Sequence, residues 1–204
     1  PLPDHIDGPL DEVQDYSGWD IKKALGLLGK SNPSLLEWLH SPIVYAQTAA
    51  WRHFADCADA YFSAERNLHH QYASAYSTWR NFLQGEQVRL KKYFYVLRPL
   101  LAVRWVEAGK GAPPMRFAEL LAGSCLEAGL RQEIDELLAR KQRAGEAEYG
   151  PRRPLLHAFI QSELLRGAIP PALPDSRTGN IRELDRLLMT TVMGNAKSES
   201  LIRV

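Results

Sequence analysis

Apolar residues recur at three- and four-residue steps along most of the chain, which is the spacing of one face of an α-helix. The repeat is clearest in residues 88–108, where the apolar positions are Leu90, Tyr93, Phe94, Leu97, Leu101 and Trp105. The same period predicts helices over residues 48–61, 64–83, 116–122, 127–144 and 154–166. A final amphipathic stretch, residues 181–193, either packs on the rest of the protein or stays loose. The pattern therefore predicts a mostly helical chain.

Two further helices are expected before residue 42. Ser17 begins the first as a helix-capping residue, with Asp20 as the acid at the third helical position. Asp20 is also explained as a capping acid in its own right. The second helix begins at Asn32, whose side chain can accept a hydrogen bond from a free N–H group of the first turn. Pro33 fits that turn because proline has no N–H group to leave unpaired.

The first sixteen residues are the only segment that suggests β-structure. Short runs near residues 4–7 and 12–16 flank Gly8-Pro9, which is typical of two strands around a turn. Two strands alone are marginal in water, so we expect them to belong to a sheet whose other strands are missing or come from elsewhere. An unpaired strand edge of this kind favours self-association.

The net charge of the chain is close to zero, but the charges are unevenly distributed along the sequence. The 204 residues hold 25 Lys and Arg against 24 Asp and Glu, a net charge of +1 that predicts neither a nucleic-acid nor a membrane partner. Residues 1–20 nevertheless hold six acids and no Lys or Arg, whereas residues 80–104 hold six bases and one acid. These two segments either pair with each other or bind a metal and a phosphate respectively.

Standard catalytic and metal-binding motifs are absent from the sequence. Residues 24–31 end like a phosphate-binding loop but lack its first glycine and its preceding strand, so a helix ending at Gly29 explains them better. His69 and His70 are adjacent and would point about 100° apart on a helix. Cys57 and Cys125 are far apart and lack metal-ligand spacing. With no apolar run near 18 residues and no signal peptide, we expect a reduced, cytoplasmic setting.

Two features could carry chemistry, each with an ordinary structural alternative. Asp15 lies at an expected strand end just before a helix, a place from which a carboxylate can reach an active site. Lys91, Lys92 and Arg98 flank the apolar face of the helix predicted over residues 88–108. These bases suit a triphosphate or a nucleic-acid backbone, while a solvated helix face explains them as well.

Four stretches together suggest a family. Residues 15–23, 30–45, 89–102 and 114–121 resemble, in order, the DNA polymerase β-like predicted nucleotidyltransferases of the bacterial RNA repair pathway family. The resemblance covers about residues 5–166. It implies an α+β, mostly helical fold, in which the remnant of a small nucleotidyltransferase mixed sheet precedes a helical bundle. The implied division is 1–45 for the nucleotidyltransferase part, 46–167 for a helical domain and 168–204 for an extension or tail.

The resemblance also implies an activity. Members would transfer a nucleoside monophosphate from an NTP to an acceptor hydroxyl, with RNA, a small molecule or a protein as the acceptor. Three carboxylates would hold two Mg²⁺ (or Mn²⁺) ions, which activate the acceptor oxygen and the leaving pyrophosphate. Two of these carboxylates belong to an Asp-x-Asp motif after a Gly-Ser helix start, and the third belongs to a later strand.

This sequence departs from that pattern at one point. It contains no Asp-x-Asp, and its Gly123-Ser124 is not followed by one. Asp15 matches the later-strand carboxylate, so the resemblance makes Asp15 the catalytic residue and metal ligand. One carboxylate cannot hold two Mg²⁺ ions, and we therefore expect this chain alone to be inactive although its parent would be an enzyme.

The resemblance further implies nucleotide-binding residues. Lys91, Lys92 and Arg98 match the basic helix of the family, and we expect them to contact phosphates. Tyr93 either stacks on a nucleotide or packs in the core. Asn32 also matches a motif position, but its capping role explains it equally well.

Two other classes of function stay open from the sequence. A non-catalytic helical interaction module would dock a partner through the acidic segment and the unpaired strand edge. A helical nucleic-acid-binding domain would use the basic stretch, and its RNA binding would be sensitive to salt and independent of Mg²⁺.

Overall fold

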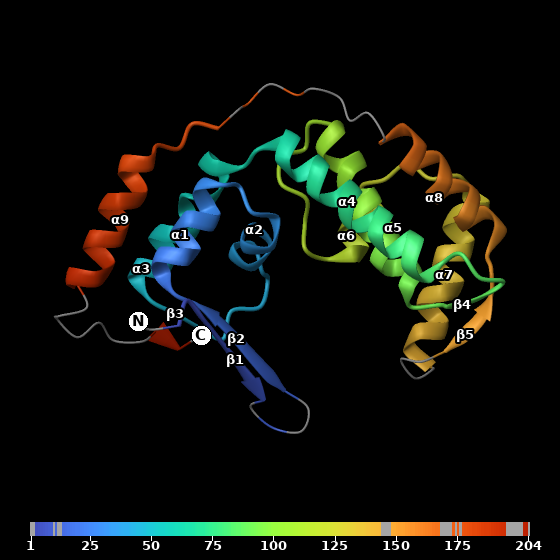
Figure 1. Ribbon diagram of the computed structural model, residues 1–204, viewed down its shortest axis with the longest axis horizontal. Helices are drawn as coiled ribbons and strands as arrows, with labels where there is room; N and C mark the ends of the chain where they lie inside the picture. Colours follow the sequence, from blue (N-terminus) through green and yellow to red (C-terminus); the bar gives the residue numbers. More distant parts are fainter. Residues whose placement is uncertain are drawn as a thin grey trace. The chain divides into compact units, whose positions relative to one another are not determined.

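The computed structural model describes residues 3–9, 11, 14–143, 148–167, 173, 175, 177–194 and 202–203. The chain forms two compact units, one made of Pro1–Ser63 with Ser176–Val204 and the other of Ala64–Asp175. These boundaries differ from the predicted division at residues 45 and 167. The fold is a mostly helical α+β, as predicted, and the described strands pair only two by two (Figure 1).

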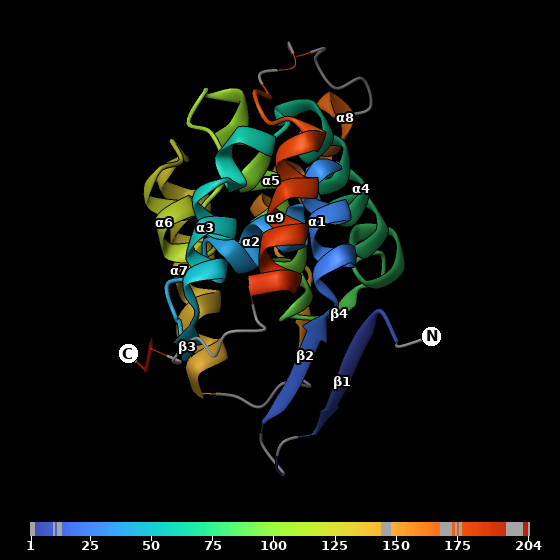
Figure 2. The same cartoon turned by 90° about the vertical axis from the view of Figure 1, so that its left-hand side faces the viewer.

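The first unit combines a hairpin with short helices. Its elements are β1 (His5–Pro9), β2 (Asp15–Trp19), α1 (Ile21–Gly29), α2 (Pro33–Leu39), β3 (Ala46–Gln47), α3 (Ala49–Asp56), the 3₁₀ helix η1 (Ala58–Tyr61), α9 (Ile181–Gly194) and β6 (Ile202–Arg203). β1 pairs with β2 in antiparallel register, and β3 pairs with β6. The hairpin projects away from the helices of its unit in both views (Figures 1 and 2). The expected strand pair exists, but its second strand lies three residues later than predicted, and Glu12 and Val13 lie outside the described residues.

Side-chain caps fix where α1 and α2 begin. Asp20 Oδ1 accepts a hydrogen bond of 2.9 Å from Lys22 N, so Asp20 is the N-cap of α1. The prediction of Ser17 as the cap is wrong, because β2 continues through Trp19 and takes Ser17 into the hairpin. Asn32 Oδ1 accepts from Leu35 N at 3.0 Å, which confirms the predicted cap of α2.

Helix α9 completes the core of the first unit. Leu184 and Leu187 are only 4% and 6% exposed, and α9 lies beside α1 in both views (Figures 1 and 2). The approach is close, since a Cβ atom on Gly29 would lie 3.2 Å from Leu184 Cδ1. The Tyr61 hydroxyl also donates to the backbone oxygen of Asn180 at 2.8 Å. Of the two alternatives for residues 181–193, packing is therefore the one that the structure shows.

The second unit is built on two long helices packed side by side. Its elements are α4 (Ala64–Phe82), β4 (Gln87–Arg89), α5 (Lys92–Glu107), α6 (Phe117–Ala122), α7 (Ala128–Arg143), β5 (Tyr149–Pro151) and α8 (Pro154–Arg166). α5 is the most buried of them and has Leu97, Leu100 and Leu101 fully buried at its centre. The strong apolar repeat of residues 88–108 thus marks the middle of this core.

A strand pair in the second unit was not expected from the sequence. β4 and β5 are antiparallel, with Arg89 opposite Tyr149, and β4 takes the residues predicted to begin the helix now seen as α5. The idea that only the first sixteen residues form strands is therefore wrong. Each strand has three residues, too few for an alternating pattern, and each finds its partner some sixty residues away along the chain.

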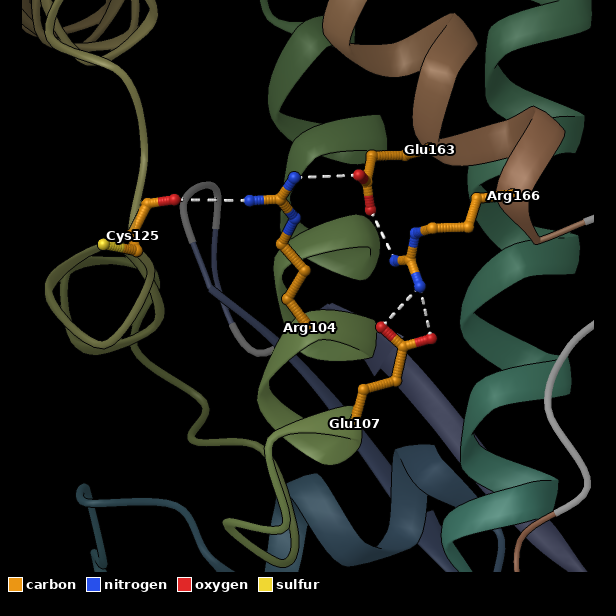
Figure 3. Close-up of polar contacts among 5 residues, drawn as sticks. All are labelled: Arg104, Glu107, Cys125, Glu163 and Arg166. Atoms are coloured by element: carbon orange, nitrogen blue, oxygen red, sulfur yellow. Dashed lines mark hydrogen bonds and ion pairs between the residues drawn. The ribbon is translucent and has the colours of Figure 1, made fainter.

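A buried carboxylate joins α8 to α5 (Figure 3). Glu163 is 4% exposed and binds Arg104 Nη2 at 2.9 Å and Arg166 Nη2 at 2.7 Å. Arg166 Nη1 in turn reaches Glu107 at 2.6 Å. Burial alone raises the pKa of Glu163, but the hydrogen bonds from the two arginines outweigh it and hold that pKa below its ordinary value. The charges alternate, so the network ties the two helices together without a large net charge.

Candidate functional site

Asp15 lies on the hairpin of the first unit. It is the exposed first residue of β2 and pairs with Pro9. Directly paired residues share a face of an antiparallel sheet, so Asp15 lies on the same face as Asp7, which is opposite Ser17. This face carries acids on both strands of the pair.

The described residues do not fit a complete two-metal centre. Within the described ranges, no three His, Cys, Asp or Glu side chains come close enough together to hold a metal ion. The family mechanism needs three carboxylates, and among the described residues of β1 and β2 the face of Asp15 carries one other carboxylate, Asp7. Asp4, at the opposite end of the hairpin from Asp15, is held by hydrogen bonds from His5 and Lys23, which lower its pKa. Metal binding at Asp15 stays a prediction.

Asn32 has a structural role as the N-cap of α2. It is half-buried, and its side-chain oxygen is occupied by the N–H group of Leu35. The preceding Ser31 has a φ of 53° and is 1% exposed, and its Oγ accepts from Ser63 N at 2.7 Å. The corner between α1 and α2 is therefore fixed from within the first unit, and a contact of Asn32 with a nucleotide stays a prediction.

Two of the three predicted bases lie at the start of α5 in the second unit. Lys91 is the residue before the helix and Lys92 is its first residue. Lys92 Nζ lies 4.0 Å from the ring centroid of Phe82 and 4.8 Å from that of Tyr95. Arg98, almost two turns further on, donates through Nη2 to the backbone oxygen of Met115 at 3.3 Å. These bases belong to the second unit, whereas Asp15 and Asn32 belong to the first.

Tyr93 packs in the core. Its side chain is fully buried, and its hydroxyl accepts from Arg153 N at 2.9 Å and lies 3.1 Å from His157 Nε2. Burial is the main cause that raises the pKa of this phenol. A ring with no exposed surface cannot stack on a ligand, so the predicted nucleotide-binding role of Tyr93 is corrected to a structural one. Tyr93 fastens the start of α8, and with it β5, to α5.

Sequence reasoning missed the aromatic residues around these bases. Phe82, Tyr95 and Tyr149 are 46%, 55% and 58% exposed. The guanidinium of Arg89 lies 5.6 Å from the ring centroid of Tyr149, across the β4–β5 pair. One signal was present, because Tyr95 falls outside the apolar repeat of its helix. We call Phe82, Arg89, Lys92, Tyr95 and Tyr149 the aromatic–basic surface.

The first unit also contains a small pocket between α3, η1 and α9. It has a volume of about 300 Å³, and its lining includes Cys57, Tyr61, Glu183 and Arg186. Burial and the nearby Glu183 raise the pKa of the Cys57 thiol. The same two causes raise the pKa of Tyr61 to about 12. Both groups therefore stay protonated at neutral pH, and the thiol is not set up as a nucleophile.

Comparison with known proteins decides the family. The RlaP family profile, described as the RNA repair pathway DNA polymerase beta family, matches residues 1–190. The chain belongs to this family. It is also 39% identical over 192 residues to YcgL of Bacillus subtilis (strain 168), a match that covers 93% of this chain and 74% of the relative. No solved structure matches the chain.

Membership of the RlaP family agrees with the resemblance found in the sequence. It relates the chain to the polymerase β-like proteins, a group of transferases, at a coarse level. None of the described helices combines the length and the apolar character that crossing a membrane requires.

Proposed function

We propose that this member of the RlaP family takes part in the transfer of a nucleoside monophosphate from an NTP to RNA. The observation that carries the proposal is the match of residues 1–190 to a family of polymerase β type that is described as belonging to RNA repair. The bases at the start of α5 support it, because cationic side chains on a helix suit triphosphates and nucleic-acid backbones.

The chemistry of transfer needs more carboxylates than the described residues bring together. We retain Asp15 as one proposed ligand of a Mg²⁺ or Mn²⁺ ion and derive no step through the metals. Lys91, Lys92 and Arg98 are proposed to bind the phosphates of the NTP as charged hydrogen-bond donors. We expect the 204-residue chain by itself to bind a nucleotide without turning it over.

Two measurements on the full 204-residue chain test this proposal. Binding of a fluorescent ATP analogue with Mg²⁺ is expected, and Lys91→Ala and Lys92→Ala should each weaken it by at least about 10-fold, since a charged hydrogen bond contributes about 1.5–3 kcal/mol. Lys22→Ala, which removes an exposed lysine of α1, is the matched control and should bind as the parent does. Asp15→Asn should remove the part of the affinity that depends on Mg²⁺.

Incorporation of radiolabelled NTP into an RNA with a free 3′ hydroxyl completes the test. No incorporation above background is expected from this chain. Measurable incorporation would overturn the predicted inactivity, while absence of any nucleotide binding would contradict the proposed function itself.

One observation favours a second function, that of a non-catalytic interaction module. Ile6 and Tyr16 are 55% and 46% exposed and share the hairpin face opposite Asp15. A sheet face with large exposed apolar groups suits association with a second copy of the chain. Light scattering over a range of concentrations would then show a dimer that Ile6→Lys abolishes. A monomer at all concentrations would leave this function without support.

A further inference from the structure

The aromatic–basic surface has features that its predicted role in binding phosphates does not require. Phosphate binding needs cations alone, yet Phe82, Tyr95 and Tyr149 stand about half exposed around Lys92 and Arg89. Each ring has one of these cations within 6 Å of its centroid. Large aromatic groups are normally buried, so three exposed rings paired with cations at one place call for a ligand with flat, apolar faces and negative charge.

These residues form two groups, one around Lys92 and one around Arg89, and each lies within residues 82–95 or on the strand paired with them. Lys92 bridges the end of α4, at Phe82, to the first turn of α5, at Tyr95. Arg89 leads into α5 from β4 and faces Tyr149 across the strand pair. Backbone hydrogen bonds from Leu90 N to Glu148 O at 3.0 Å and from Arg152 N to Glu86 O at 3.1 Å close both ends of that pair.

The charge of this region is strongly positive although the whole chain is nearly neutral. Residues 80–98 and 148–153 hold seven Lys or Arg and two acids, in a chain of net charge +1. One of the two acids, Glu148, is paired with Arg140. Rings supply stacking faces for bases and cations supply partners for phosphates, which is the pattern of single-strand binding surfaces.

We infer that the aromatic–basic surface binds single-stranded RNA, with unpaired bases stacked on Phe82, Tyr95 and Tyr149 and phosphates held by Lys92 and Arg89. Bases inside a duplex are already stacked, so exposed rings select unpaired segments. This inference deepens the proposed function and rests on it for the choice of RNA, because it identifies the surface that receives the acceptor strand.

Fluorescence anisotropy with a labelled oligouridine RNA tests the inference on the 204-residue chain. The buffer contains EDTA and no NTP, so the result is independent of metal and of nucleotide binding. We expect the double variant Phe82→Ala with Tyr95→Ala to bind at least about 10-fold more weakly, since stacking on an aromatic side chain is worth about that much or more per base. Lys92→Ala should also lower the dependence of log K on log salt by about 0.7.

A matched control separates stacking from general damage. Tyr76→Ala removes an α4 tyrosine that is 55% exposed, the same fraction as Tyr95, and that lies outside the aromatic–basic surface. It should bind within about 2-fold of the parent. Circular dichroism monitors folding, and if the double variant fails to fold, the single exposed substitutions Tyr95→Ala and Tyr149→Ala carry the same test.

Each other outcome overturns the inference. No RNA binding, or equal binding by parent and aromatic variants, would mean that the rings do not stack on bases. Displacement of the RNA by polyglutamate at equal charge would mean that the surface recognises negative charge alone, as in an acidic protein partner. Equal competition by DNA of the same base sequence would overturn the assignment to RNA. If RNA binding fails while the ATP analogue binds, only this inference falls and the proposed function stands.

Discussion

The strand pairs β1–β2 and β4–β5, one in each unit, are held in place by different means. In β4–β5, Val88 is 1% exposed and Gly150 is buried against Leu90, so this pair lies directly on the core of its unit. In β1–β2, every described residue is at least partly exposed. Two of its large apolar side chains, Ile6 and Tyr16, lie across the glycines opposite them and stay about half exposed.

The difference lies in what holds each pair. Among the described residues, the β1–β2 hairpin is held where it meets the helices, by the stacking of Trp19 on Trp38 with ring centroids 4.1 Å apart and by the bond from Lys23 Nζ of α1 to Asp4 Oδ1 at 3.2 Å. The β4–β5 pair packs on buried side chains, and the bond from Arg153 N to the Tyr93 hydroxyl holds the residues just after β5. Two strands alone are only marginally stable. The β4–β5 pair, which packs on the core, therefore holds its exposed residues in fixed positions, whereas the β1–β2 pair does not.

The largest effect should come from removing an apolar contact beneath β4–β5. Leu90→Ala takes away a side chain that is 4% exposed and should lower the free energy of unfolding by about 2–5 kcal/mol. Ile6→Ala is the matched change in the exposed hairpin and should stay within about 0.5 kcal/mol. Urea unfolding followed by circular dichroism measures both. Equal effects would show that the two pairs are supported alike.

Loss of the buried carboxylate between α5 and α8 should rank second. Glu163→Gln removes one charged partner of Arg104 and Arg166, which are themselves partly exposed, so we expect a loss of about 1–3 kcal/mol. Because the pKa of Glu163 is lowered in the folded state, its contribution is fully present above pH 4.5 and is lost as the pH falls through the folded pKa. The variant should therefore lose less stability in acid than the parent.

A surface ion pair of the same unit provides the contrast for Glu163. Asp135→Asn disrupts the exposed pair with Arg131 on α7 and should change the free energy of unfolding by no more than about 0.5 kcal/mol. If this change matched the effect of Glu163→Gln, burial would not be what makes the carboxylate important.

The junction of the hairpin with α2 should show a smaller and local effect. Trp38→Ala removes the ring that stacks on Trp19, an interaction worth about 0.5–1.5 kcal/mol beyond its buried area. Amide hydrogen exchange should accelerate in β1 and β2 and stay unchanged in β4 and β5. Faster exchange in both strand pairs would contradict independent support of the two.

The smallest effect should be a dependence on pH near neutrality. Burial, followed by the charge of Arg152, lowers the pKa of His157 from its ordinary 6.5. The unfolded chain therefore takes up a proton first, so stability is complete above pH 6.5 and declines as the pH falls toward the folded pKa. Unfolding titrations at three pH values should show this slope. It should disappear in His157→Phe and persist in His69→Gln, which changes an exposed histidine of α4.

The sequence predicted the helices better than their ends. The apolar repeat located the core of α5, but the helix starts four residues later than expected because β5 pairs with the residues before it. A partner sixty residues away leaves no local signal. Ser17 failed as a cap for a related reason, because pairing with Asp7 draws it into β2 and leaves the cap to Asp20.

The basic residues of the candidate site could be predicted from the sequence, but the exposed aromatic residues beside them could not. Lys91, Lys92 and Arg98 were visible as bases beside an apolar face, since charge can be read from residue type alone. The exposed rings of Phe82 and Tyr149 were not, because exposure depends on which helix or strand covers each ring. Tyr93 shows the converse, as an aromatic in a basic motif that belongs to the core.

The packing of α9 on α1 sets the order in which the protein can mature on the ribosome. Domains generally fold in the order of their synthesis, but the first unit lacks Leu184 and Leu187 until residues 64–175 have been made. The part of α1 that packs on α9 therefore stays uncovered while the continuous second unit is made and folds, although α2 and η1 can already pack on α1. The unit that is synthesised first is therefore completed last.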